Sequence, residues 1–230
     1  MIFLIVLVVV VVVIILKVRS IHLRIDFKSF FKRGFNKVDS PHGLICYTRC
    51  STVHGKTYSS VALLKKLLKD SDYTVITNVK SLKVTPKTIY FSDIGDVIDF
   101  VNKNYEQGKY IIFFDEIFSV MERNIQRRKS NDNIKTFISQ LRKRNMFLIT
   151  TAQIWSKIDI ELRKMCRFQV SCKIVKMPFT NKAIVINNIN DGYKIKWDTL
   201  ENDFIAPRIQ TNVSKGLLSV IKSYDSWEII

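Results

Sequence analysis

Three segments of the 230-residue chain carry residue types that bind phosphate groups and divalent cations. The first, residues 50–57, has the sequence Cys-Ser-Thr-Val-His-Gly-Lys-Thr between a predicted strand and a predicted helix. In the template G-x-x-x-x-G-K-[ST], backbone N–H groups and a helix N-terminus hold phosphates, the lysine binds the outer phosphates and the hydroxyl binds Mg²⁺. Gly55, Lys56 and Thr57 match, but Cys50 replaces the first glycine. A chance Gly-Lys-Thr at a helix start is the alternative.

The second segment, residues 111–116, is an apolar run that ends in two acids, Asp115 and Glu116. In nucleotide hydrolases, the first acid of such a pair holds the Mg²⁺ shell and the second polarises the attacking water. An acidic cap on a following helix would produce the same pattern and is the alternative. A buried strand that ends in two adjacent acids is the less common arrangement, so the pair strengthens the interpretation of the first segment.

The third segment, residues 146–153, is another apolar strand and ends in the polar Gln153. Two arginines, Arg163 and Arg167, follow this segment and lead into a β-rich stretch.

The segments lie at strand ends of a chain that alternates between strand and helix from about residue 40. Apolar and β-branched runs predict strands, and apolar residues at helical spacing predict helices. The alternation predicts an α/β fold with a parallel sheet and right-handed crossovers. The predicted strands are 44–48, 73–77, 88–92, 109–114 and 146–151, and the predicted helices are 56–69, 94–106 and 131–144.

Two finer expectations concern the arrangement of these elements. The 88–92 strand is expected to lie between the strands of the first two motifs, and Asn131 or Asp132 is expected to cap the helix 131–144. Past residue 165, alternating β segments are predicted at 168–176, 183–188 and 193–197, followed by an irregular tail.

The order of the motifs resembles one known superfamily. Gly-Lys-Thr, an apolar strand ending in Asp-Glu, a basic helix end, a strand ending in Thr-Ala-Gln and an I-D-x-x-L-R segment follow one another between residues 40 and 190. This pattern is similar to the FtsK/HerA superfamily of P-loop ATPases. Within it, the chain most resembles Zot-type filamentous-phage assembly proteins and the related genome-packaging ATPases of membrane-containing viruses. The resemblance implies a RecA-like P-loop NTPase fold of the additional-strand, catalytic-glutamate type, with helices flanking the sheet and with ATP and Mg²⁺ as cofactors.

The resemblance also implies a role for each matched residue. Thr57 and Asp115 would hold Mg²⁺, Glu116 would activate water, and Lys56 and Gln153 would contact the γ-phosphate. The residues expected around the nucleotide are Ser51, Thr52, Val53, His54, Gly55, Lys56, Thr57 and Tyr58.

For the two arginines, the resemblance implies a finger that acts across a subunit boundary in a homo-oligomeric ring, expected to be a hexamer. Either Arg163 or Arg167 could be this finger, and the sequence does not choose between them. A structural salt bridge to Asp159 or Glu161 is the alternative.

A basic segment, residues 121–130, follows the acid pair and contains Arg123, Arg127, Arg128 and Lys129. In a ring-shaped translocase, a loop in this region faces the pore, where its bases would contact DNA phosphates. A solvated basic loop is the alternative.

Composition limits the classes of protein that the chain can be. Lys and Arg number 37 against 20 Asp and Glu, which gives a net charge of +17 and favours a polyanionic partner such as nucleic acid, nucleotide or an anionic membrane face. Four cysteines without a C-x-x-C pair exclude a disulfide scaffold and a zinc ribbon. These cysteines are expected to be buried thiols in a reducing compartment.

Residues 1–16 contain no polar side chain and predict a single-pass membrane anchor, assigned to 1–18. A signal peptide is disfavoured because no basic region precedes the run and no small-x-small site follows it. A buried strand is disfavoured because the run is too long. Seven Lys/Arg and one acid between Lys17 and Lys37 predict that the rest of the chain is cytoplasmic. The best-known filamentous-phage relatives carry their anchor after the ATPase domain, so the position here departs from theirs.

The resulting prediction is an anchor (1–18), a basic juxtamembrane linker (19–39), an ATPase domain (40–200) and a C-terminal tail (201–230). The leading hypothesis is an ATPase in the host cell membrane that moves phage DNA during virion assembly, with other assembly or coat proteins as further partners. A packaging motor that fills a preformed capsid is the second hypothesis. A membrane tether that recruits DNA without hydrolysis is the third, and the four residues Lys56, Thr57, Asp115 and Glu116 argue against it.

Overall fold

The computed structural model describes residues 42–49, 55–69, 71–104, 109–117, 128–176, 183–199, 203–216, 220 and 222–223. The predicted anchor, the basic linker, residues 50–54 of the phosphate loop and residues 121–127 of the basic segment lie outside this set. Among the described residues, no helix is both long enough and apolar enough to cross a membrane.

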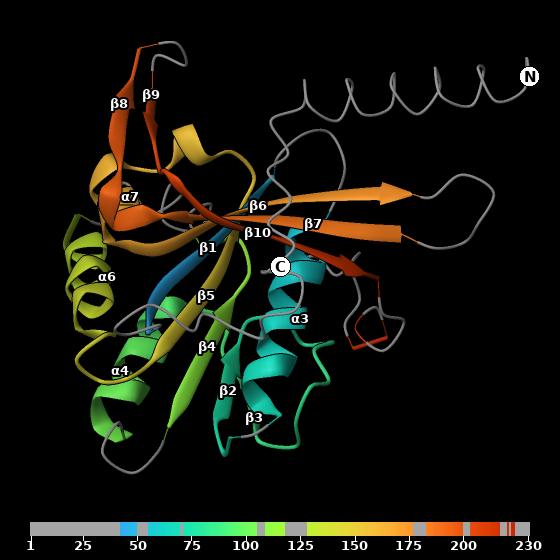
Figure 1. Ribbon diagram of the computed structural model, residues 1–230. Helices are drawn as coiled ribbons and strands as arrows, with labels where there is room; N and C mark the ends of the chain where they lie inside the picture. The colour runs from blue at the N-terminus through green and yellow to red at the C-terminus, as the bar shows by residue number, and fades with distance from the viewer. Residues whose placement is uncertain are drawn as a thin grey trace, which may run out of the picture.

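A sheet of eight strands forms the centre of the molecule. The strands are β1 (Gly43–Arg49), β2 (Thr74–Thr77), β3 (Thr88–Tyr90), β4 (Tyr110–Phe114), β5 (Phe147–Ala152), β6 (Cys166–Lys176), β7 (Ala183–Asp191) and β10 (Arg208–Lys215). Their order is β10-β7-β6-β1-β5-β4-β2-β3 (Figure 1). The strands from β6 to β3 in this order are parallel, whereas β7 and β10 are antiparallel additions at one edge. The predicted α/β fold with a mostly parallel sheet is confirmed.

The strand between the two motif strands is β5, so the expectation for the 88–92 segment is wrong. β5 pairs with β1 on one side and with β4 on the other, while β3 pairs with β2 at the far edge. All six residues of β5 are buried, as a central strand requires. β3 has three residues, none of them buried, and this suits an edge.

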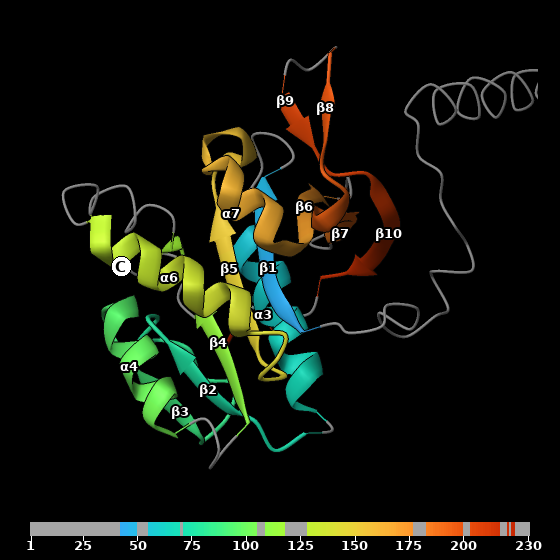
Figure 2. The ribbon, with the colours of Figure 1, turned by 90° about the vertical axis from the view of Figure 1, so that its left-hand side faces the viewer.

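Helices cover both faces of the sheet (Figure 2). α3 (Lys56–Leu68) lies on one face, while α4 (Ile94–Asn104), α6 (Arg128–Gln140) and α7 (Ile160–Met165) lie on the other. Successive strand residues face opposite layers. In β1, Leu44 and Cys46 enter the core under α4 and α6, whereas Ile45 and Tyr47 enter the core under α3.

The helix predicted at 131–144 begins earlier and ends earlier than expected. α6 starts at Arg128, so Asn131 and Asp132 lie inside it and neither caps its N-terminus. Residues 141–145 form turns that lead directly into β5. Three cysteines in the described residues, Cys46, Cys166 and Cys172, are buried free thiols, as expected.

Past residue 197, the described residues include two strands where an irregular tail was expected. β10 extends the main sheet by pairing with β7, and β9 (Asp203–Ile205) pairs with β8 (Lys196–Asp198) in a separate two-stranded sheet. The sequence of β10 is rich in polar residues, and part of its pairing is polar, since the Thr211 hydroxyl donates to Asn188 Oδ1 over 2.8 Å. Such a strand lacks the apolar run from which strands are predicted.

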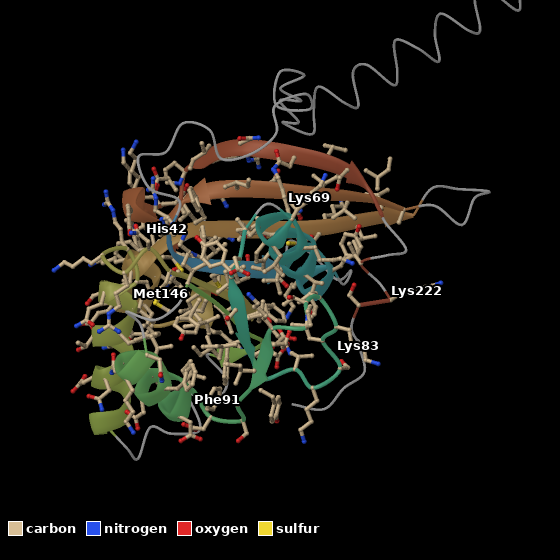
Figure 3. All side chains as sticks on the ribbon, turned by 90° about the horizontal axis from the view of Figure 1, so that it is seen from below. His42, Lys69, Lys83, Phe91, Met146 and Lys222 are labelled. Carbon is tan, nitrogen blue, oxygen red and sulfur yellow. The ribbon has the colours of Figure 1, made fainter. Side chains whose placement is uncertain are left out.

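Seen from below, α3 and α4 lie on opposite sides of the sheet (Figure 3). Phe91, which directly follows β3, packs its ring against Phe100 of α4, with 5.4 Å between the ring centroids. This contact ties the edge of the sheet to the helical layer.

Candidate active site

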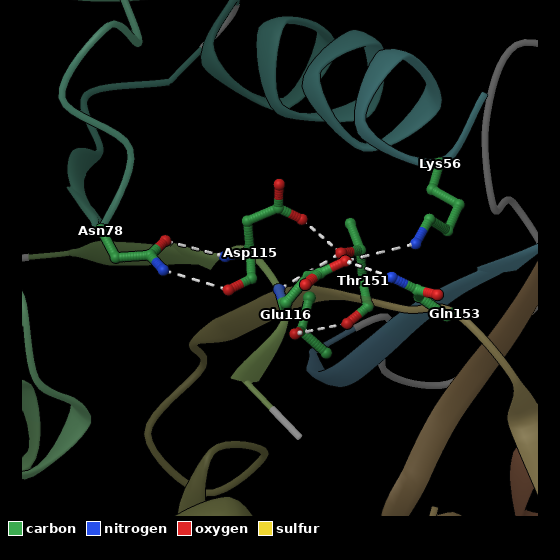
Figure 4. A network of polar contacts seen from close by, with 7 residues as sticks. Lys56, Asn78, Asp115, Glu116, Thr151 and Gln153 are labelled. Carbon is green, nitrogen blue, oxygen red and sulfur yellow. Dashed lines mark hydrogen bonds and ion pairs between the residues drawn. The ribbon is translucent and has the colours of Figure 1, made fainter. Parts of the chain in front are cut away.

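The two predicted acids lie in a turn at the carboxyl end of β4. Glu116 has a φ of 52°, a left-handed conformation that is uncommon for a residue with a side chain. The Thr151 hydroxyl, from β5, donates to Asp115 Oδ1 and accepts a hydrogen bond of 3.2 Å from the Glu116 backbone N–H (Figure 4). One hydroxyl therefore fixes both acids, and this fixation stabilises the unusual backbone at Glu116.

A second support comes from Asn78, the residue after β2. Its side-chain Oδ1 accepts from the Asp115 N–H over 2.8 Å, and its Nδ2 donates to the Asp115 carbonyl over 3.0 Å. Asn78 is buried, so this pair of hydrogen bonds is protected from water. The amide thus pins the backbone of Asp115 from the neighbouring strand.

Asp115 is a buried acid, with 8% of its surface exposed. Burial raises its pKa, and the hydrogen bond from Thr151 only partly opposes this rise. A nearby cation would therefore stabilise the ionised form of this buried carboxylate.

Lys56 begins α3 and lies across from this turn. Gly55, before it, has no side chain that could cap α3, and the first turn of α3 contains no acid. A Cβ atom on Gly55 would lie 2.8 Å from Ile174 Cγ1 of β6. The close packing of α3 on β6 therefore requires glycine at this position.

Two side chains from other elements converge on the carboxylate of Glu116. Lys56 Nζ lies 3.7 Å from Glu116 Oε1, and Gln153 Nε2 donates to the same oxygen over 3.4 Å. Glu116 remains 39% exposed, so water can reach its carboxylate. The structure thus brings together Lys56, Asp115, Glu116 and Gln153, which come from all three sequence motifs.

Comparison with known proteins gives the family. The model of the AAA family, "ATPase family associated with various cellular activities", matches residues 53–175, which is more than half of the 230-residue chain. The chain belongs to the AAA family. It is therefore an ATPase, and the predicted P-loop enzyme class is confirmed. A search of the curated proteins gave no match.

Several solved structures are similar to this AAA ATPase in shape. The N-terminal domain of zonular occludens toxin from Neisseria meningitidis aligns at 14% identity and TM-score 0.47, covering 80% of this chain and 100% of that chain. ATPases 2 and 3 of EssC from Geobacillus thermodenitrificans align at 13% identity and TM-score 0.43, covering 69% of this chain and 41% of that chain. The genome-packaging NTPase B204 from Sulfolobus turreted icosahedral virus 2 aligns at 10% identity and TM-score 0.44, covering 74% of this chain and 100% of that chain.

The site of the AAA ATPase fits a nucleotide with Mg²⁺. No group of three or more His, Cys, Asp and Glu that could hold a metal ion occurs in the part of the chain that is described. Mg²⁺ does not need one, because it is commonly bound by one or two protein oxygens together with phosphates and water. The Asp115 carboxylate and the Thr57 hydroxyl are such oxygens, and the bound ion would neutralise phosphate charge. Lys56 and the N-terminus of α3 would bind the phosphates.

Some of the predicted nucleotide-binding residues cannot be placed here. Ser51, Thr52, Val53 and His54 lie outside the described residues, as does Cys50. Tyr58 is described, but its side chain is buried in the core between α3 and the sheet, so only its backbone could face a nucleotide.

The two candidate finger arginines of the AAA ATPase form ion pairs within the chain, with other partners than expected. Arg163 Nη1 lies 2.8 Å from Asp203 Oδ1, and Arg167 Nη1 lies 3.6 Å from Asp191 Oδ1. The expected alternative partners, Asp159 and Glu161, are used elsewhere. Asp159 caps α7, and Glu161 pairs with Lys135.

Sequence reasoning missed two residues of the site, Asn78 and Thr151. Both stand at the carboxyl ends of buried strands, Asn78 after β2 and Thr151 within the last residues of β5. A polar residue at such a strand end is a weak signal by itself. It becomes informative only once the strand order places β2 and β5 on either side of β4.

The substitution Asp115→Asn is expected to raise the thermal stability of the nucleotide-free protein. The raised pKa of Asp115 means that its ionisation lowers the free energy of unfolding. The contribution of the protonated acid to stability is complete below the unfolded-state pKa and is lost as the pH rises through the folded-state pKa. At neutral pH, asparagine removes this cost and still accepts from Thr151. Each 1 kcal/mol gained corresponds to roughly 2–4 °C in a chain of this size.

Thermal unfolding at pH 7 and at pH 4 without Mg²⁺ measures this effect. The gain should shrink at the lower pH, where Asp115 takes up a proton. Asp99→Asn, at an exposed position of α4, is the matched control and should leave the melting temperature unchanged. A lower melting temperature for Asp115→Asn at pH 7 would contradict the expectation.

Proposed function

We propose that this AAA ATPase is a membrane-anchored motor that uses ATP hydrolysis to move phage DNA during virion assembly or extrusion. The observation that carries the proposal is the convergence of Lys56, Asp115, Glu116 and Gln153 at one edge of the sheet, held by Asn78 and Thr151. Such an arrangement can bind phosphates, hold Mg²⁺ and activate water. It supports hydrolysis rather than passive tethering.

DNA as the moved substrate is supported by charge. The net charge of +17 favours contact with a polyanion, and the contact would weaken with salt as counterions are released. The basic residues between 121 and 130 would face the pore of a hexameric ring. In this ring, Arg163 or Arg167 would leave its intrachain aspartate to reach the neighbour's nucleotide.

Membrane anchoring is supported by the uncharged residues 1–16 and by the bases that follow. As a helix, these 16 residues would span roughly 24 Å, and a snorkelling Lys17 would close part of the remaining distance to a ~30 Å hydrocarbon core. The excess of Lys and Arg after the run supports an ATPase domain on the cytoplasmic side of the host membrane.

A packaging motor that fills a preformed capsid remains a second candidate, since it would use the same chemistry. A neighbouring gene for a small coat protein supports extrusion, and one for a jelly-roll capsid protein supports packaging.

The proposal is tested by the ATPase rate of the full chain in detergent, with and without DNA. DNA is expected to stimulate turnover several-fold, and the stimulation should fall steeply between 50 and 200 mM salt, roughly as expected for several phosphate contacts. A polyglutamate of equal charge is the control for a general polyanion effect. Equal rates with and without DNA would refute the motor. For the anchor, a variant lacking residues 1–19 should leave carbonate-washed membranes, and its retention there would refute that assignment.

A further inference from the structure

The β8–β9 hairpin stands away from the body of the molecule at the end where β1 and β5 terminate (Figures 1 and 2). It carries the most exposed large apolar side chain among the described residues, Trp197, at 51%. Ile205, across the hairpin, is 37% exposed, and Tyr193, just before it, is 44% exposed. Exposed aromatic groups gathered on a projecting element are typical of a contact surface.

The ring of Trp197 is held in place rather than left free to rotate. It meets Phe204 of the paired strand edge to face, with 5.1 Å between the ring centroids and an angle of 75°. This contact orders the indole before any ligand binds, and this lowers the entropy cost of binding.

The charges around the hairpin favour an anionic partner. Lys194, Lys196 and Arg208 are exposed. The acids Asp191 and Asp203 of the same region already form ion pairs with Arg167 and Arg163. Lys194 also lies 3.8 Å from Asp191, and Asp198 follows Trp197 on β8. The five bases (Arg163, Arg167, Lys194, Lys196 and Arg208) still outnumber the three acids (Asp191, Asp198 and Asp203), so the charge around Trp197 is positive in sum.

An ordered aromatic ring beside several cations is the combination that binds single-stranded nucleic acid. Every base has a π-face that can stack on an indole, and the cations follow the phosphates. A duplex keeps its bases stacked on one another, so it offers this ring far less exposed base surface.

The base of the hairpin is fastened to the segment that carries the predicted sensor. Trp155, two residues after Gln153, donates its Nε1–H to the Phe204 carbonyl over 3.3 Å. Arg163 binds Asp203 and also donates to the Phe204 carbonyl over 3.4 Å. The same Arg163 has the one buried side-chain nitrogen, Nε, that lacks a hydrogen-bond partner among the described residues, so its network is incompletely satisfied.

We propose that the β8–β9 hairpin binds single-stranded nucleic acid through base stacking on Trp197. This inference rests on the proposed function, because it names a contact for the DNA that the motor would move. The hydrogen bond from Trp155 to the Phe204 carbonyl joins the hairpin to the segment that begins at Gln153, and so to the candidate hydrolytic site.

The test compares three variants of the full chain in detergent: Trp197→Ala, Trp197→Phe and the control Tyr90→Ala. Tyr90 is also a largely exposed aromatic residue near a lysine, with Lys80 Nζ 5.3 Å from its ring, but it lies on the opposite edge strand β3. Fluorescence anisotropy of a labelled 20-nucleotide oligothymidylate measures single-strand affinity, and a duplex of equal length is measured in parallel.

Trp197→Ala is expected to weaken single-strand binding by about 5- to 150-fold, the range for loss of one stacked base. Trp197→Phe should keep most of the affinity, and Tyr90→Ala should bind as the wild type does. Duplex binding should change much less. Because Trp197 is half exposed, its replacement should leave the melting temperature nearly unchanged.

Each contrary result has a distinct meaning. If the wild type binds DNA and Trp197→Ala binds it equally well, the hairpin assignment is wrong while the motor can stand. An equal loss on single strands and duplex would overturn stacking. A change of oligomeric size in Trp197→Ala, at unchanged DNA affinity, would show the surface to be a subunit contact instead. If the wild type binds no DNA at all, the proposed function and this inference fail together.

Discussion

Glu116→Gln is expected to lower the turnover of ATP by about 10²- to 10⁴-fold, the usual effect of losing a general base. The amide cannot accept a proton from the attacking water. The backbone at this position should not change, because its N–H still bonds to Thr151 and Asn78 still holds Asp115. The loss should therefore be one of chemistry and not of folding.

Nucleotide affinity in Glu116→Gln should be equal to that of the wild type or higher. In the nucleotide-free protein, Lys56 Nζ lies 3.7 Å from Glu116 Oε1, so part of the charge of Lys56 is engaged by the glutamate. A neutral glutamine frees this lysine for phosphate. Steady-state turnover and equilibrium binding of a fluorescent ATP analogue separate the two effects.

The matched control is Glu161→Gln, the same chemical change at an exposed position of α7, where Glu161 pairs with Lys135. It should leave turnover unchanged. Equal turnover in wild type and Glu116→Gln would remove Glu116 from the hydrolytic role.

Lys56→Ala is expected to weaken ATP binding by about 10- to 100-fold. A hydrogen bond from a charged group contributes roughly 1.5–3 kcal/mol, and its loss converts to about 10- to 150-fold, of which the lower part is expected here. The change also removes the ion pair between the Glu116 carboxylate and the lysine at the N-terminus of α3. Two negative groups, the phosphates and Glu116, would then repel each other, and this adds to the loss.

Titration calorimetry with ATP and Mg²⁺ measures this effect. Lys66→Ala removes a lysine from an exposed position of the same helix α3 and should bind ATP as the wild type does. The double variant Lys56→Ala with Glu116→Gln should recover part of the lost affinity, because the repulsion is gone. Unchanged affinity in Lys56→Ala would show that the loop does not hold the nucleotide.

The residues expected to perform the chemistry were chosen from the sequence alone, and their roles stay predictions. Each lies directly after a run of apolar residues: Asp115 and Glu116 after β4, and Gln153 after β5. Such runs form buried parallel strands, and parallel strands end at the same edge of a sheet. Local pattern therefore sufficed to predict that Lys56, Glu116 and Gln153 meet, and the 3.7 Å and 3.4 Å contacts agree.

The order of strands could not be predicted from the same patterns. β3 and β5 both consist of β-branched, aromatic and aliphatic residues that are typical of strands, and their local sequence does not say which lies between β1 and β4. That choice depends on which strand can be covered on both faces. The fully buried six residues of β5 take the centre, and the short β3 takes the edge.

The partners of the site residues were likewise decided only by tertiary structure. Asn78 and Thr151 gain their roles from strand order, and Arg163 gains Asp203 from a hairpin 40 residues further along the chain. Contacts of this kind join residues that are distant in sequence and carry no periodic signal. Sequence determined which groups of this ATPase can react, because apolar runs fix strand ends locally. The fold decided what holds those groups in place, because side-chain partners follow from packing across the whole sheet.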